Sequence, residues 1–239
     1  GGYERPMWFA LDGEVANYEY SYNYQNWYPS AEYETSNTIK NVGLFDLTPF
    51  SKFEIKSEKA QQELQKICTA NIKNDIGKCT YTHMLNTDGG IETDLTVVCV
   101  DENHYRIISS AATRERDKFH IKKHLSEDIE LIDVTDNYCV FGLFGPKSRE
   151  LIKTLSNDNF DNENFKFGTA KNITIDGKNI WAQRLSYVGE LGYELYVKFE
   201  DAKKIYDLLI LKGKDFNLSN CGMHAMDIMR MESGFLHWG

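Results

Sequence analysis

The stretch Tyr81-Thr-His-Met-Leu-Asn-Thr-Asp-Gly-Gly-Ile-Glu-Thr-Asp-Leu-Thr-Val-Val98 decides how the rest of this sequence is interpreted. It predicts two strands joined by a turn, because Asp88-Gly89-Gly90 supplies positive-φ positions and β-forming residues stand on both sides. Asp94 lies inside the second strand, where aspartate is unfavourable. A carboxylate there is costly unless it meets water, hydrogen-bond donors or a ligand. Asp94 is therefore either a solvated or turn-anchoring residue, or a functional one.

The composition is that of an ordered globular protein. The 239 residues suffice for one large domain or two small ones; 41% of them are hydrophobic and only 4 are Pro. Lys and Arg number 27 against 36 Asp and Glu, which gives a formal net charge of -9. No basic block of five or more residues occurs. We therefore expect neither nucleic acid nor an anionic membrane to be the main partner.

The cysteines and histidines predict no disulfide framework and no metal site. His120 and His124 have helical i,i+4 spacing, but no H-E-x-x-H motif accompanies them, so an exposed helix face explains them better. The sequence also has no apolar run of membrane-spanning length and no signal-peptide pattern. We expect a soluble, cytoplasmic protein whose five separated cysteines are buried reduced thiols: Cys68, Cys79, Cys99, Cys139 and Cys221.

Strands and helices alternate along the chain, and most strands come in hairpins. The aromatic segment 18–28 fits either a strand or an ordered loop. Apolar patterns predict strands at 41–48, 52–56, 104–109, 129–134, 138–144 and 193–197. A second hairpin is predicted at 173–186, with Asp176-Gly177 at its turn. Helices are predicted at 57–70, 113–125, 201–212, 222–233 and from Pro146 onward. Hairpins favour mixed or antiparallel sheets, hence an α+β fold. A loosely similar order of elements divides the chain into 1–136, which includes the aromatic segment, and 137–239.

A second informative stretch is Tyr187-Val-Gly-Glu-Leu-Gly-Tyr-Glu194. Its two glycines permit a backbone turn, after which the chain enters a strand near Glu194. From spacing alone, Glu190 and Glu194 are better explained as ordinary surface carboxylates than as functional residues.

Both stretches resemble signatures of the aminomethyltransferase family. This family comprises the folate-binding T-protein of the glycine cleavage system and the folate-binding modules of dimethylglycine and sarcosine dehydrogenases. The first stretch matches as Met84-Leu-Asn-x-x-Gly-Gly-Ile-x-x-Asp94-Leu-x-Val97, and the second as Y-x-G-E-x-G-x-E. The opening Y-E-R-P-x-W-F-A is similar to the dehydrogenase-linked branch. Smaller matches lie at 44–48, 143–146 and 230–234.

The resemblance implies a pseudo-duplicated α+β folate-binding fold with mixed or antiparallel sheets and flanking helices. In the family, a C-terminal β-barrel usually follows this unit. The sequence ends at Trp238-Gly239, about where the barrel would begin, so we expect the barrel to be absent from this chain.

The resemblance also implies the site residues. The family's catalytic aspartate matches Asp94, and the glutamate that binds the amino and amide edge of the pterin matches Glu194. A carboxylate suits that edge because it accepts two parallel N–H bonds. The remaining family pocket positions, each equally explained by core packing, match Tyr187, Tyr105, Phe50 and Ile107.

The implied function is tetrahydrofolate-dependent transfer of a one-carbon unit from a methylated amine or amino acid. A flavin-dependent dehydrogenase or a carrier protein is the implied partner. Two alternatives stay open: a non-catalytic or partner-dependent folate-binding module of a flavin-dependent demethylating system, and a folate-dependent demethylase of a sulfonium compound. Met226 departs from the family, which often has an arginine near the glutamyl tail of folate. Thr48-Pro49 replaces the Ser-His usual in the T-protein.

Overall fold

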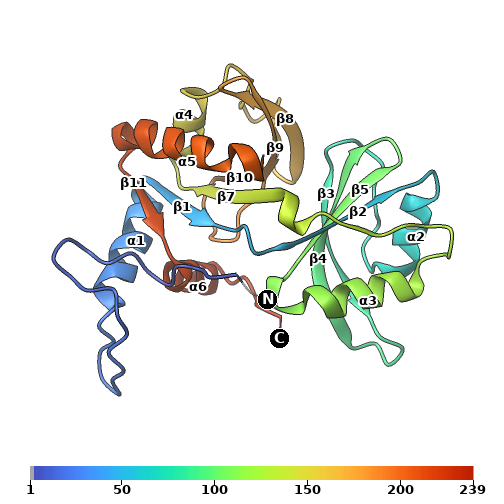
Figure 1. Cartoon of the computed structure of the whole chain (residues 1–239), viewed down its shortest axis with the longest axis horizontal. Coiled ribbons are helices and arrows are strands. Elements are labelled where there is room, and N and C mark those ends of the chain that lie inside the picture. Colours follow the sequence, from blue (N-terminus) through green and yellow to red (C-terminus); the bar gives the residue numbers. More distant parts are fainter. Residues whose placement is uncertain (1–2, 239) are drawn as a thin grey trace.

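Two β-sheets form the frame of the molecule, as the computed structural model of residues 3–238 shows (Figure 1). The first sheet has six strands in the order β11-β1-β7-β10-β9-β8. Its strands are β1 (Val42–Asp46), β7 (Tyr138–Phe144), β8 (Thr169–Ile175), β9 (Lys178–Arg184), β10 (Gly192–Lys198) and β11 (Leu218–Cys221). The pair β1 and β11 is parallel, whereas β1–β7, β7–β10, β10–β9 and β9–β8 are antiparallel. The predicted mixed sheet is confirmed.

The second sheet is antiparallel and has five strands in the order β3-β4-β5-β2-β6. They are β2 (Ser51–Lys56), β3 (Cys79–Leu85), β4 (Ile91–Asp101), β5 (His104–Ser109) and β6 (Ile132–Asp133). The predicted strand 129–134 is thus much shorter, because only Ile132 and Asp133 pair with β2.

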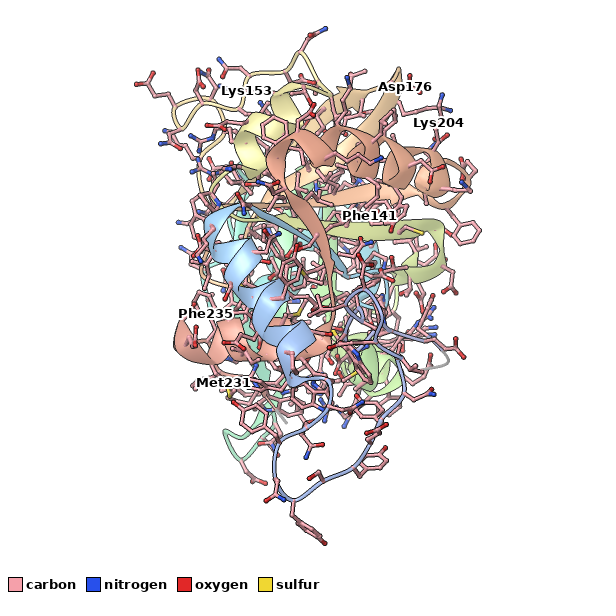
Figure 2. The ribbon with its side chains drawn as sticks, turned by 90° about the vertical axis from the view of Figure 1, so that its left-hand side faces the viewer. Phe141, Lys153, Asp176, Lys204, Met231 and Phe235 are labelled. Atoms are coloured by element: carbon pink, nitrogen blue, oxygen red, sulfur yellow. The ribbon has the colours of Figure 1, made fainter. Side chains whose placement is uncertain are left out.

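The two predicted hairpins are present, and polar side chains stabilise their turns. Between β3 and β4, Gly89 has φ +82°, and the Asn86 side chain accepts hydrogen bonds from the backbone N–H groups of Asp88 (3.0 Å) and Gly90 (2.8 Å). Between β8 and β9, Asp176 and Gly177 have positive φ. Asp176 also forms an ion pair with Lys204, and the two side chains lie together in Figure 2.

Helices cover the outer faces of both sheets and one end of the first. They are α1 (Tyr28–Lys40), α2 (Ala60–Ile67), α3 (Arg114–His124), α4 (Ser148–Lys153), α5 (Phe199–Gly213) and α6 (Met223–Glu232). Helix α1 was not predicted; it lies against β1, β11 and α6. The aromatic segment before it is a loop that projects from the body (Figure 1).

Two helix starts were predicted too early. Helix α4 begins after Lys147, because Gly145 (φ +125°) and Pro146 form a turn in which the Ser148 N–H donates to Gly145 O at 3.0 Å. Helix α2 begins at Ala60, because the Ser57 hydroxyl accepts from the Lys59 N–H in the turn before it.

Three apolar clusters make up the core. One lies on the outer face of the six-stranded sheet beneath α4 and α5, and another on the outer face of the five-stranded sheet beneath α2 and α3. The third, here called the inner cluster, joins the facing sides of both sheets with α6; it includes Val98, Ile108, Val140, Trp181, Tyr196, Met226 and Met229. The sheets therefore share one apolar interior.

The predicted division at residue 137 stays a prediction. Strand β1 belongs to the predicted first half, yet it pairs with β7 and β11 of the second half.

All five cysteines are free; four are buried and Cys139 is half-buried. Across residues 3–238, no helix is long and apolar enough to cross a membrane.

Candidate functional site

The inner faces of the two sheets carry the two carboxylates that the sequence singled out. Along β4, Leu95 and Val97 point into the apolar cluster beneath α2 and α3. Because side chains alternate along a strand, Asp94 and Val98 point toward the inner side. Along β10, the same alternation sends Leu195 outward and turns Glu194 and Tyr196 inward. The structure thus brings Asp94 and Glu194 to the interior that the two sheets share.

Asp94 is half-buried and held by a tyrosine. The Tyr81 hydroxyl on β3 donates a 3.0 Å hydrogen bond to Asp94 Oδ2. Burial, together with the neighbouring Asp94 carboxylate, raises the pKa of Tyr81 to about 12, so the phenol remains a donor at neutral pH. His83, directly opposite Asp94 in the hairpin, packs edge-on against the Tyr81 ring. Asp94 therefore has a fixed orientation and keeps access to solvent.

Glu194 is half-buried at the centre of the six-stranded sheet, between Gly142 of β7 and Gln183 of β9. The Tyr196 hydroxyl donates a 3.0 Å hydrogen bond to Glu194 Oε2. Burial raises the pKa of Glu194 to about 7, although the bond from Tyr196 acts in the opposite direction. The carboxyl group therefore loses its proton less readily than an exposed glutamate, and a ligand that donates hydrogen bonds to it would favour the charged form.

Tyr187 and Phe50 also border the inner cluster. The Tyr187 hydroxyl donates to Leu236 O at 3.3 Å, and its ring stacks on Phe235, which follows α6 (Figure 2). Burial raises the pKa of Tyr187, and the negative charge of Asp94 adds to this effect. Tyr187 therefore lies at the edge of the inner cluster, beside the segment that follows α6.

The structure does not bring Tyr105 and Ile107 to the same face as Asp94 and Glu194, so their place in the pocket stays a prediction. They pair with Cys99 and Val97, and all four side chains belong to the outer cluster beneath α2 and α3. The physical reason is the two-residue period of a strand: a position that is displaced by one residue changes face.

The neighbours of these two residues on β5, Arg106 and Ile108, face inward instead. Arg106 is buried; its Nη2 and Nε lie 2.7 and 3.0 Å from Glu54 Oε1, and its guanidinium lies over the rings of Tyr138 (4.7 Å) and Tyr196 (5.7 Å). The signal in the sequence was a charged residue inside an apolar strand, as at Asp94.

Three buried polar atoms on the inner faces have no hydrogen-bond partner: Arg106 Nη1, Trp181 Nε1 and Gln183 Nε2. Buried donors without partners are rare in folded proteins, and they concentrate where a ligand or an ordered water completes the structure. The sequence analysis did not single out these residues.

Met226 is buried in the inner cluster, where it packs with other apolar side chains of α6. The side chain that stands in place of the family's arginine is thus part of the core in this chain.

Within residues 3–238, no cluster of three or more His, Cys, Asp or Glu side chains is suited to a metal ion. The rings of His120 and His124 lie against each other on α3, and His124 Nδ1 is 2.8 Å from the backbone oxygen of His120.

The chain is similar in sequence to several proteins that act on methylated amines or carry the aminomethyltransferase name. It is 33% identical over 239 residues to 4-methylaminobutanoate oxidase (formaldehyde-forming) of Paenarthrobacter nicotinovorans and 31% identical over 241 residues to mitochondrial dimethylglycine dehydrogenase of Rattus norvegicus. Both matches cover 100% of this chain but only 29% and 28% of those proteins. An aminomethyltransferase of Halothermothrix orenii is 32% identical over 208 residues, which are 86% of this chain and 58% of that protein.

Two solved structures share the fold. The glycine cleavage system aminomethyltransferase T from Bartonella henselae superposes with a TM-score of 0.76 at 19% identity, over 92% of this chain and 60% of that one. A chain of the heterotetrameric sarcosine oxidase from Corynebacterium sp. U-96 superposes with a TM-score of 0.61 at 11% identity, over 79% of this chain and 93% of that one. The model of the GCVT N-terminal domain family matches residues 1–239. The chain belongs to the GCVT N-terminal domain family.

Proposed function

We propose that this chain binds tetrahydrofolate between its two sheets and transfers a one-carbon unit to it from a methylated amine or amino acid. The observation that carries the proposal is the state of Glu194. It is a half-buried carboxyl group on the inner face, its pKa is raised to about 7 by burial, and one hydroxyl, that of Tyr196, bonds one of its two oxygens. A desolvated carboxylate with an uncommitted oxygen suits a planar ligand edge that presents two parallel N–H groups.

The surroundings fit the aromatic ring system of such a ligand. The side chains on the inner faces of both sheets are mostly apolar and aromatic, such as Val98, Ile108 and Trp181, with a small number of polar groups among them. Flat ligands commonly bind in sites of this composition. The buried N–H groups without partners on the same faces also favour a polar ligand here.

The proposed roles follow from the geometry. Tetrahydrofolate, when bound, would supply the ring nitrogen that forms a bond to the one-carbon unit at unchanged oxidation state, while the bond from that carbon to the donor's amine nitrogen breaks and the amine leaves. Glu194 holds the ring by its donor edge. Asp94, oriented by the Tyr81 hydroxyl at 3.0 Å, orients the reacting groups and holds the proton that the accepting nitrogen loses. Tyr187, stacked on Phe235, contributes an aromatic surface at the edge of this region. Most of the acceleration comes from holding both reactants in line.

The small share of each relative's length that this chain matches supports a second function. The chain spans only 29% and 28% of the oxidase and dehydrogenase that it resembles. In that setting, the chain is a folate-binding module that receives its one-carbon unit from a flavin-dependent partner.

Calorimetric titration of tetrahydrofolate into the purified chain tests the proposal. We expect micromolar binding that is lost in Glu194→Ala and kept in Glu200→Ala, which removes an exposed carboxylate at the start of α5. No binding to the unmodified chain at millimolar tetrahydrofolate would overturn the proposal. Binding without transfer from any methylated amine would favour the module function.

A further inference from the structure

Gln183 lies beside Glu194 on the inner face of the six-stranded sheet. The two residues are directly opposite each other in the antiparallel pair β9–β10. Side chains at such positions leave the same face of a sheet with their Cβ atoms about 5 Å apart. A ligand edge that binds the Glu194 carboxylate therefore comes within reach of the Gln183 amide.

The Gln183 side chain is 0% exposed, and its Nε2 has no hydrogen-bond partner. Its Oε1 lies 4.0 Å from Cys79 Sγ of β3, and that thiol, which has one proton to donate, also lies 3.8 Å from Gly77 O. Burial raises the pKa of Cys79, which keeps the thiol protonated and able to donate. This contact occupies the oxygen end of the amide and leaves the N–H end uncommitted.

A buried amide that makes one weak contact is unfavourable in the protein alone. The most direct explanation is that a ligand acceptor completes the hydrogen bonding. Because Nε2 is closed off from solvent, its partner has to be a group that leaves water as well, as a flat ring inserted between the sheets does.

Resting on the proposed function, we propose that Gln183 Nε2 donates to the ring carbonyl oxygen that neighbours the donor edge bound by Glu194. The carboxylate and the carboxamide then recognise a contiguous donor-donor-acceptor edge, which is that of a 2-amino-4-oxo ring. Gln183 is thus a specificity residue that distinguishes 4-oxo pteridines from 2,4-diamino pteridines.

The discrimination follows from unpaired donors. A 4-amino group places an N–H opposite the Gln183 N–H and leaves both without an acceptor. Sites that are built around buried hydrogen bonds reject ligands that lack the matching group much more strongly than apolar pockets reject a small change in size. Part of the preference also comes from Glu194, since the 4-amino ring lacks the proton on its 3-nitrogen.

The experiment crosses the protein change with the ligand change. Tetrahydrofolate and tetrahydroaminopterin, its 4-amino counterpart, are titrated by calorimetry into the unmodified chain, Gln183→Met and Gln61→Met. The Met side chain keeps the length and removes the N–H. Gln61 is the matched control, because it lies on α2, away from the inner face, and its amide donates to Ile72 O.

We expect Gln183→Met to weaken the binding of tetrahydrofolate about tenfold and to change the binding of the 4-amino analogue by less than twofold. Gln61→Met should change the affinity for neither ligand. An equal effect of Gln183→Met on both ligands would overturn the inference while leaving the proposed function intact. Failure of the unmodified chain to bind either ligand would refute the proposed function itself. If Gln183→Met shows no thermal unfolding transition, Gln183→Glu is used in its place. We expect Gln183→Glu to shift the ratio of the two affinities toward the 4-amino analogue. An unchanged ratio would contradict the inference.

Discussion

Tyr196 donates a 3.0 Å hydrogen bond to Glu194 from two residues further along the same strand, β10. Behind the Tyr196 ring lies the guanidinium of Arg106, 5.7 Å from the ring centroid, and Arg106 is in turn paired with Glu54 at 2.7 Å. A continuous row of contacts thus runs from the five-stranded sheet to the carboxylate of the six-stranded sheet. The Tyr196 hydroxyl at the end of this row orients Glu194 and limits the rise of its pKa.

Tyr196→Phe removes the one hydroxyl that lowers the pKa of Glu194, so we expect that pKa to rise above 7. At pH 7 a smaller fraction of the carboxyl group is then charged, and tetrahydrofolate binds about three- to tenfold more weakly. Calorimetry from pH 6 to pH 9 should show the midpoint of binding shifted upward. The control is Tyr193→Phe, whose side chain lies on the outer face. An unchanged midpoint in Tyr196→Phe would contradict this role of the hydroxyl.

Glu194→Gln should stabilise the protein without ligand at alkaline pH. The pKa of the folded protein, about 7, is raised above the ordinary value of 4.5, so the folded state binds the proton more tightly than the unfolded state. The unfolding free energy of the unmodified chain therefore falls as the pH rises from about 4.5 to 7. Glutamine removes this cost, and we expect a gain of about 2 kcal/mol at pH 8 and little gain at pH 4. Urea unfolding at both values checks this; equal differences would refute it.

Glu54→Gln should destabilise the fold, because it leaves the buried Arg106 charge without its carboxylate. Although burial opposes ionisation, His104 and Arg106 hold the pKa of Glu54 at about 2. The stabilisation is therefore present above the ordinary value of 4.5 and is lost as the pH falls toward 2. We expect a loss of about 3 kcal/mol at pH 7 and a smaller loss at pH 3, measured by urea unfolding. The exposed Glu58→Gln serves as the comparison, and an equal loss in it would point to a different cause.

Short sequence patterns correctly predicted the positions of the turns and the pairing of the hairpin strands. The turns at Gly89 and at Asp176-Gly177 are where the sequence placed them, since few residue types tolerate a positive φ. The aromatic segment, for which the sequence left a strand and a loop open, is a loop, and the hairpins correctly favoured antiparallel pairing. Helix α1 was missed because most of its buried positions are polar, Ser30, Glu34, Thr35, Asn37 and Thr38 among them, so it shows no apolar stripe.

The contacts between distant segments were beyond the reach of sequence patterns. The parallel pairing of β1 with β11 joins Val42 to Leu218, a separation that no local signal records. The face of β5 was also ambiguous, because Tyr105, Ile107 and Ile108 are all apolar enough to be buried on either side. Arg106 was the one residue that distinguished the faces. The inward position of Arg106 is explained by its hydrogen bond to Glu54 of another strand, β2, which sequence patterns do not show.

Asp94→Asn tests whether the hairpin aspartate is a catalytic residue. The amide keeps the shape and still accepts a hydrogen bond from Tyr81, so the fold and tetrahydrofolate affinity should change less than threefold. It cannot hold a proton, so we expect one-carbon transfer to fall at least a hundredfold. Tyr81→Phe, which removes the orienting hydroxyl but keeps the carboxylate, should reduce transfer about tenfold. Single-turnover assays with a methylated amine donor measure both, with Asp88→Asn in the exposed turn as the matched control. Full activity of Asp94→Asn would remove Asp94 from the mechanism, whereas lost affinity in the same variant would make it a binding residue.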